Sequence, residues 1–183
     1  MTAVTIPTLT TERLTLRAPD PQDVDTLVTF YASERSAFVG GPKTRAMAWR
    51  QLATEIGHWT LRGYGRWMVD LTETGETVGM VGLWNPLEWP EAEIGWDLFE
   101  GHEGRGYATE AALAARAHAY DVLGWTTAIS LVDADNAGSA AVARRMGAAP
   151  DGMATPPGYE TPVHVYRHPG PEALAEGGVE AYA

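Results

Sequence analysis

The chain has 183 residues, of which 45% are apolar and 20% are charged, an ordinary balance for one folded domain. It contains no cysteine, so disulfides, thiolate nucleophiles and cysteine metal sites are excluded. Its net charge of −11, from 13 basic and 24 acidic residues, argues against a nucleic-acid partner, because such binding needs Lys and Arg to neutralise phosphates.

The acidic balance has two interpretations. It would attract a cationic acceptor such as a protonated amine, or it only favours solubility. No stretch approaches the roughly 20 apolar residues of a membrane span. The first seven residues lack the basic region and apolar run of a signal peptide. We therefore expect a cytoplasmic location and no membrane partner.

The N-terminal third predicts one strand and two amphipathic helices. Residues 13–18 alternate apolar and polar side chains, as in a half-buried strand. Asp20 and Pro21 then provide a helix N-cap and a proline at the first helical position. The second helix ends at Gly63. The apolar faces of the two helices are Val24, Leu27, Val28 and Tyr31, and then Trp49, Leu52, Ile56 and Trp59.

Three strands follow the helices. Residues 66–71 and 77–84, joined by a turn at 73–76, predict a hairpin, and residues 92–99 predict a third strand after a loop with two prolines. Trp49 and Trp59 are expected in the core. The remaining tryptophans of this region are expected to pack in the core or to line a ligand pocket: Trp67, Trp84, Trp89 and Trp96.

The C-terminal half predicts two more helices and two more strands. An alanine-rich helix follows the glycine-rich segment 101–106 and stops at Gly124, and residues 126–132 form a strand. Asn136 caps a helix that runs to Met146, and residues 163–167 form the last strand. The predicted order is β-α-α-β-β-β-α-β-α-β in a single domain, 1–167, with a flexible tail over 168–183.

The segment around Gly104 and Gly106 is the most informative. It lies between a strand and a helix, where glycines let the backbone approach a ligand and the first helical amides have no internal partner. A pyrophosphate fits such a corner, although a purely structural turn is an alternative. A Rossmann fingerprint does not fit, because Thr109 stands where the third glycine is needed and a hairpin precedes the segment. A Walker A loop is excluded by the missing Gly-Lys-Ser/Thr.

This segment resembles the acetyl-CoA loop of the GNAT acetyltransferases, whose pattern is Gln/Arg-x-x-Gly-x-Gly/Ala. Gly104 and Gly106 match its glycines, whereas Gly101 stands where Gln or Arg is usual. The resemblance covers roughly residues 9–167 and is closest to the branch of the ribosomal-protein N-terminal (RimJ/RimL-like) acetyltransferases. Five ordered segments carry it: 11–17, 63–67, 93–96, 104–111 and 136–139.

The resemblance implies an α/β fold with a central, mostly antiparallel twisted sheet, splayed at the cofactor strand and flanked by about four helices. It implies an N-acetyltransferase that uses acetyl-CoA as co-substrate, without metal or acyl-enzyme, and a homodimer is a further expectation. The amine acceptor is a protein N-terminus, an aminoglycoside-like or polyamine-like amine, or an amino acid derivative, and fold analogy cannot choose among them. The alternative function is a catalytically silent acyl-CoA-binding regulatory module.

The resemblance also implies site residues. The proton acceptor for the attacking ammonium is expected to be Glu93, with Asp97 on the same strand face and Glu160 in a later loop as further options. Ser139 is expected to face the sulfur as proton donor, and it is otherwise only a helix-starting residue after Asn136. The residues expected to bind the cofactor are Leu98, Phe99, Glu100, His102, Glu103, Gly104, Arg105, Gly106, Tyr107, Ala108, Thr109, Asn136 and Ser139.

Overall fold

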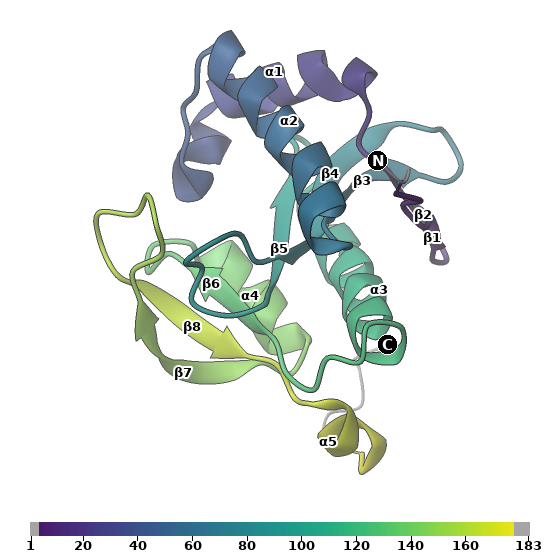
Figure 1. Ribbon diagram of the computed structural model, residues 1–183, viewed down its shortest axis with the longest axis vertical. Coiled ribbons are helices and arrows are strands. Elements are labelled where there is room, and N and C mark those ends of the chain that lie inside the picture. The colour runs from purple at the N-terminus through teal and green to yellow at the C-terminus, as the bar shows by residue number, and fades with distance from the viewer. Residues whose placement is uncertain (1–3, 178–183) are drawn as a thin grey trace.

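The computed structural model describes residues 4–177 (Figure 1). Its strands are β1 (Leu9–Thr10), β2 (Leu14–Arg17), β3 (Arg66–Leu71), β4 (Thr77–Trp84), β5 (Glu93–Leu98), β6 (Ile129–Val132), β7 (Ala149–Ala154) and β8 (Val163–Arg167). Its α-helices are α1 (Val24–Ala32), α2 (Arg45–Arg62), α3 (Tyr107–Asp121), α4 (Ala137–Arg145) and α5 (Pro171–Ala175). Two 3₁₀ helices, η1 (Pro21–Asp23) and η2 (Glu34–Val39), flank α1.

The eight strands form one sheet in the order β1-β2-β3-β4-β5-β6-β8-β7. Every neighbouring pair is antiparallel except β5 and β6, which are parallel and pair only at Glu93 and Ile129. The sheet is therefore split beyond that pair. This confirms the predicted mixed α/β fold with a mostly antiparallel sheet that opens beside the expected cofactor strand.

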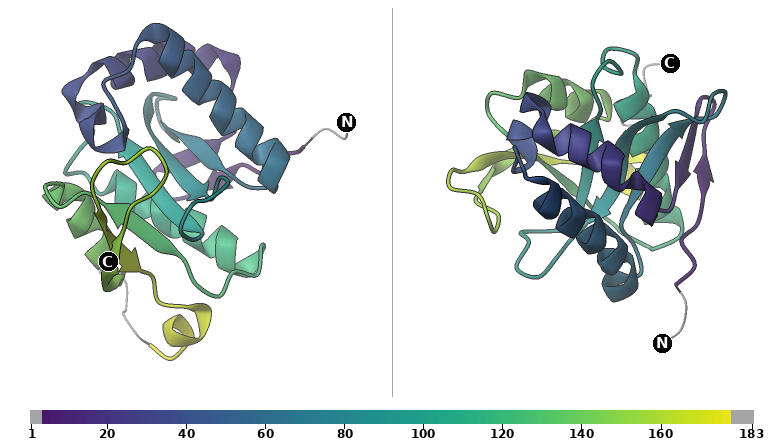
Figure 2. Two further views of the ribbon diagram at one scale, coloured as in Figure 1. Left: turned by 60° about the vertical axis from the view of Figure 1, so that its left-hand side comes forward. Right: turned by 90° about the horizontal axis from the view of Figure 1, so that it is seen from above.

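Helices cover both faces of the sheet (Figure 2). On one face, α1 and α2 pack against the cross-strand pair Met68 and Met80. On the other face, the alanine-rich side of α3 packs against Val81, Leu83 and Ile94. Small alanine side chains let α3 lie close to the strands, which brings the start of this helix to the edge of the split.

Two short strands and a short helix were not predicted. β1 has only two residues, and β7 contains Pro150 and Gly152 and exposes five of its six residues, so neither shows an alternating pattern. β7 lies at the edge of the sheet, where proline is tolerated. α5 follows a Gly170-Pro171 start within the expected tail.

The expected tail begins too early. His168 is only 2% exposed, and its Nε2 lies 2.9 Å from Ser130 Oγ, so this residue belongs to the folded core. The predicted tail residues 178–183 lie outside the described part of the chain. No helix within residues 4–177 is both long and apolar enough to cross a membrane.

The prediction that Trp49 lies in the core is wrong, because its side chain is 60% exposed. The buried face of α2 instead includes Leu52, Trp59 and two polar residues, Glu55 and His58. Both polar side chains have hydrogen-bond partners, Arg66 for Glu55 and the Tyr64 carbonyl for His58, so both can be buried. The buried face of α2 therefore includes these two residues and does not include Trp49.

Candidate active site

The glycine-rich corner has the predicted conformation. Gly101, Gly104 and Gly106 all have positive φ (85°, 72° and 82°), and a side chain at Gly101 or Gly104 would project into open space. Gly106 is the N-cap of α3 and offers no side-chain cap, so the first amides of a 15-residue helix face outward. The corner therefore has the unpaired amides and the dipole direction with which helix N-termini attract anions.

Arg13, which the sequence did not indicate, lies in the bend just before β2 and braces this corner. Its Nη1 donates to the carbonyl of Arg105 at 2.9 Å, and its guanidinium pairs with Glu110 on α3 at 2.6 Å. The ring of Tyr107 lies beneath the guanidinium, 4.9 Å from Cζ. These contacts fix the loop against α3.

A cavity of about 1070 Å³ opens beside the corner, between β5, α3 and α4. Nine of the thirteen expected cofactor residues line it: Leu98, Glu103, Gly104, Arg105, Gly106, Ala108, Thr109, Asn136 and Ser139. The other four residues do not line this cavity. Phe99 packs against Phe30, Glu100 is exposed, His102 faces Glu76, and Tyr107 lies under Arg13.

Thr109, on the first turn of α3, provides a test of fit for a phosphate-containing cofactor. Its hydroxyl oxygen is buried in the cavity wall and has no hydrogen-bond partner among residues 4–177. A buried hydroxyl without a partner is costly, so a polar ligand in the cavity would satisfy it. The open glycines, the uncapped helix and this hydroxyl together fit an anionic ligand.

The split in the sheet exposes backbone groups to the same cavity. The carbonyls of Ala92 and Ile94 face β6, where they accept from Ile129 N–H and Ser130 Oγ. The N–H and C=O groups of alternate residues point the same way along a strand, so those of Trp96 and Leu98 also face the split. Arg35, another residue that the sequence did not indicate, donates its Nε–H to the Leu98 carbonyl at 3.2 Å.

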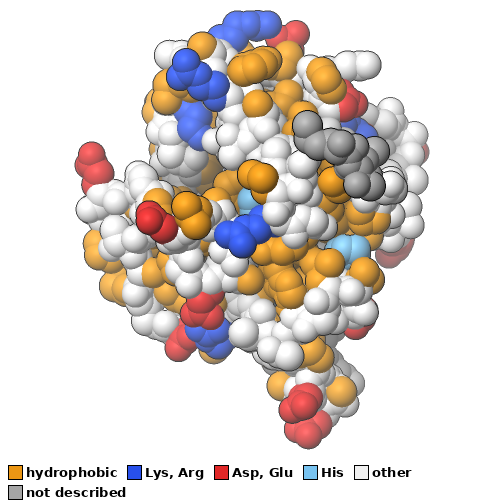
Figure 3. Space-filling model, viewed as in Figure 1, with side chains coloured by type: hydrophobic (Ala, Val, Ile, Leu, Met, Phe, Trp, Pro, Cys, Tyr) orange, Lys and Arg blue, Asp and Glu red, His pale blue; other side chains and the backbone are white. Residues whose placement is uncertain are grey.

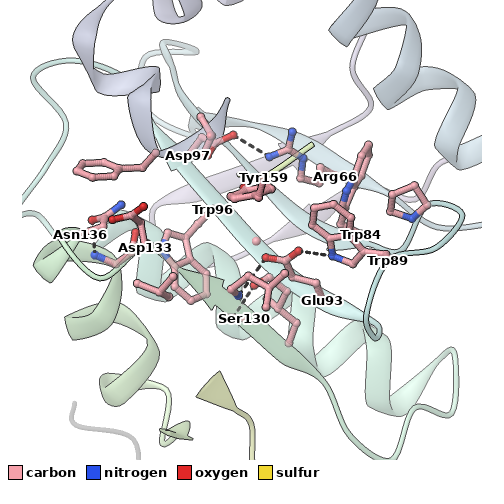
Figure 4. Close-up of a pocket in the computed structure, with 18 of the residues that line it drawn as sticks. Arg66, Trp84, Trp89, Glu93, Trp96, Asp97, Ser130, Asp133, Asn136 and Tyr159 are labelled. Atoms are coloured by element: carbon pink, nitrogen blue, oxygen red, sulfur yellow. Dashed lines mark hydrogen bonds and ion pairs between the residues drawn. The ribbon is translucent and has the colours of Figure 1, made fainter. Parts of the chain in front are cut away.

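A second cavity of about 380 Å³ lies on the α1–α2 side of β5 (Figure 4). The two cavities share the wall residues Phe38, Val39, Trp96, Asp97, Asn136 and Ser139. They therefore adjoin at the centre of the split. Trp84, Trp89 and Trp96 line the smaller cavity, whereas Trp67 is fully buried in the core.

Glu93 lies at the base of the smaller cavity and is 8% exposed. Its Oε2 accepts the indole N–H of Trp89 at 2.7 Å, and its Oε1 accepts the N–H of Leu131 at 3.2 Å (Figure 4). Burial nevertheless raises the pKa of the Glu93 carboxyl to about 7, against the two donors that stabilise its charge. A carboxyl with this pKa exchanges protons near neutral pH.

Asp97 shares this strand face, as period-two counting predicts, because the register of β5 with β4 is regular from Glu93 to Leu98. Asp97 accepts from Arg66 Nη1 at 2.7 Å, and the same guanidinium pairs with the fully buried Glu55 of α2. Burial raises the pKa of Asp97, although Arg66 opposes this. The sequence contains one sign of this cluster. Glu55 lies three residues after Leu52 and four before Trp59, so a carboxylate falls within the apolar face of α2, where it needs a partner.

Ser139 and Asn136 meet at the start of α4. Asn136 Oδ1 accepts the N–H of Ser139 at 3.0 Å, so it is the helix N-cap that the sequence predicts. Ser139 Oγ accepts the indole N–H of Trp96 at 3.3 Å. Since an indole N–H can only donate, the hydroxyl proton of Ser139 is left to point elsewhere, and the residue lines both cavities.

Glu160 is exposed and lines neither cavity, so the structure gives it no contact with the other candidate residues. Its neighbour Tyr159 does line the smaller cavity, and its ring lies 6.3 Å from that of Trp89. Within residues 4–177 no three His, Asp or Glu side chains are placed to hold a metal ion.

Comparisons with known proteins identify the family of this chain. Residues 13–149 match the acetyltransferase (GNAT) domain family. A crystal structure of an acetyltransferase from Agrobacterium tumefaciens is 43% identical and covers 92% of this chain and 97% of its own, with a TM-score of 0.83.

Two further similarities are more distant. RimL, a ribosomal L7/L12 α-N-protein acetyltransferase solved with coenzyme A, is 22% identical, has a TM-score of 0.69 and covers 86% of this chain and 94% of its own. An uncharacterized N-acetyltransferase, p20, from Bacillus licheniformis is 35% identical over 109 residues, or 57% of this chain. The match spans 61% of the length of that relative.

Proposed function

The chain belongs to the GNAT acetyltransferase family and is an acyltransferase, and we propose that it moves the acetyl group of acetyl-CoA directly to a primary amine. The proposal depends most on the two adjoining cavities. One contains the glycine-lined anion corner, the other contains buried carboxylates, and they meet at Trp96, Asp97 and Ser139. Donor and acceptor can therefore enter from opposite sides of β5.

The larger cavity is proposed to hold the cofactor, which supplies an acetyl thioester when bound. The amides from Gly104 to Ala108 would hold its diphosphate, with Thr109 as an additional hydroxyl partner. The backbone groups of Trp96 and the N–H of Leu98 would pair with amides of an extended ligand, as a missing strand would.

Glu93 is proposed to accept the proton that the ammonium must lose before the nitrogen can attack. Its burial, its contact with the acceptor cavity and its pKa of about 7 all suit that role. Asp97 is held in an ion pair with Arg66 at the junction of the cavities, which leaves Glu93 as the carboxylate there without a cationic partner. Ser139 has a free hydroxyl proton and is proposed to protonate the departing thiolate.

Acetyl transfer to a panel of amines would test this proposal. We expect time-dependent release of free thiol and one acetylated product by mass spectrometry, with acetyl-CoA and amine both required. Glu93→Gln should lower kcat by about tenfold or more, since general bases contribute 10²–10⁴-fold in most enzymes, while CoA affinity is kept. Binding of CoA without transfer to any amine would instead favour the silent acyl-CoA-binding module.

A further inference from the structure

The charge of the smaller cavity is unevenly distributed. Its only cationic wall residue among those described is Arg66, whose Nε, Nη1 and Nη2 are all bonded to Glu55 or Asp97. Lys43, above the Tyr31 ring at 4.0 Å, offsets the remaining negative charge of that cluster. This leaves Glu93 and Asp133 as the wall charges available to a ligand, and both are acidic.

The rest of the wall is mainly aromatic and aliphatic. Trp84, Trp89, Trp96 and Tyr159 surround the space above Glu93 (Figure 4), and Ile94 and Leu131 lie beside it. Trp89 and Tyr159 come from two separate loops and meet edge to face. In the view of Figure 1, hydrophobic side chains gather over the middle of the molecule with some cationic and His side chains among them, and most acidic side chains lie toward the rim (Figure 3).

The volume of about 380 Å³ is at the low end of cavities that bind small molecules, which are about 300–1,000 Å³. We propose that the acceptor is a small primary amine attached to an aromatic or branched apolar group and free of any carboxylate. Its ammonium group meets Glu93, with Asp133 as the other unpaired acid of the wall, and its apolar body lies among the tryptophans and Tyr159. This inference rests on the proposed function, because it names the substrate class of the same site.

Other acceptors fit the walls less well. A carboxylate beside the amine would face two acidic side chains with no unpaired cation among the described wall residues. The second ammonium of a polyamine could reach Asp133, but it would be desolvated against the tryptophan and leucine side chains that line most of the wall. A peptide N-terminus would place its first amide in the same apolar surroundings, where few donors and acceptors could pair with it.

The test compares kcat/KM with acetyl-CoA for acceptors that differ in one group. The series is 2-phenylethylamine, phenylalanine amide, phenylalanine, putrescine and a short peptide with an N-terminal serine. We expect 2-phenylethylamine to be the best acceptor, and phenylalanine amide to exceed phenylalanine by about tenfold or more, or about 1.4 kcal/mol, because the carboxylate of phenylalanine meets like charges. The amide controls for bulk, so this last ratio isolates the charge.

The alternative results separate the two proposals. If phenylalanine, putrescine or the peptide equals or exceeds 2-phenylethylamine, the substrate class is wrong and acetyl transfer to amines still stands. If no amine is acetylated while CoA binds, the proposed function itself fails.

Asp133→Asn offers a second measurement on the same ratio. The Oδ1 of Asp133 accepts the N–H of Asp135 at 2.9 Å, and an asparagine keeps this bond while removing the charge. We expect the preference for phenylalanine amide over phenylalanine to fall by about threefold or more. Glu73→Gln, the same loss of charge in an exposed turn outside both cavities, should leave the ratio unchanged. An equal ratio in wild type and Asp133→Asn, with CoA binding intact, would reject the electrostatic argument.

Discussion

Replacing Glu93 by Gln is expected to change how the stability of the fold depends on pH. Burial raises the pKa of this carboxyl from the ordinary 4.5 to about 7. Between these two pH values the folded chain holds a proton that the unfolded chain has released. The contribution of Glu93 to stability is therefore fully present below about pH 4.5 and is lost as the pH rises to about 7.

The size of the effect follows from the width of this window. Each pH unit across it changes the free energy of unfolding by about 1.4 kcal/mol, so the whole window amounts to about 3 kcal/mol. Gln is neutral at every pH and removes this slope. The NH₂ group of the Gln side chain would also face one of the two N–H donors, that of Trp89 or that of Leu131, and could not accept from it. The lost hydrogen bond costs about 1–3 kcal/mol at all pH values.

Urea unfolding of both proteins at several pH values measures the effect. The free energy of unfolding of wild type minus that of Glu93→Gln should fall by about 3 kcal/mol between the lower and upper ends of the window. The constant cost of the lost hydrogen bond cancels from this change, and Glu73→Gln serves as a control with an exposed carboxylate. If the free energies of unfolding of the two proteins change with pH in parallel, the Glu93 carboxyl titrates as it does in an unfolded chain. That result would also remove the reason to assign it proton transfer at neutral pH.

Three further substitutions test the cofactor corner, Ser139 and the sheet. Gly106→Asp should weaken CoA binding by at least about tenfold relative to Gly106→Asn, because only the aspartate adds negative charge beside the diphosphate, and equal affinities by calorimetry would contradict the anion site. Ser139→Ala should lower kcat by about tenfold or more with unchanged CoA affinity, whereas Ser139→Thr keeps most activity, and an unaltered kcat would leave Ser139 as a helix-starting residue. Gly82→Ala should destabilise the fold by about 2 kcal/mol or more, because a Cβ there would lie 2.6 Å from the Gly65 carbonyl oxygen. Its cross-strand partner offers the control: a Cβ at Gly95 meets only Glu93 Oε1 at 3.8 Å, so a similar loss of Tm in Gly95→Ala would refute the steric argument.

The parts of the fold with strong local signals were predictable from the sequence. Asp20 and Asn136 are N-caps as predicted, Gly63 has the left-handed conformation that ends a helix, and the hairpin turns where expected. Each of these features depends on the chemistry of a few neighbouring residues. β7 has no such signal, since it forms only because β8 offers a free edge.

The site was only partly predictable for the same reason. Glu93 and Asp97 were placed on one face by counting along a single strand. The partners that define their environments come from distant segments: Trp89 and Leu131 for Glu93, and Arg66 for Asp97. Sequence alone does not show which of these segments meet, and the burial that raises the pKa of Glu93 depends on all of them.

The ladder between β5 and β6 contains a single residue pair, Glu93 and Ile129, and two side-chain bonds, between Ser130 and Ile94 and between Glu93 and Leu131, lie beside it. A molecule that bridges the gap beyond them would therefore also hold the two parts of the sheet together. By mass action, a ligand at a hundred times its dissociation constant stabilises the folded chain by about 2.7 kcal/mol. The supply of bridging ligand therefore helps to set how often the chain opens to proteases, so starvation for that ligand would shorten the lifetime of the protein as well as stop its catalysis.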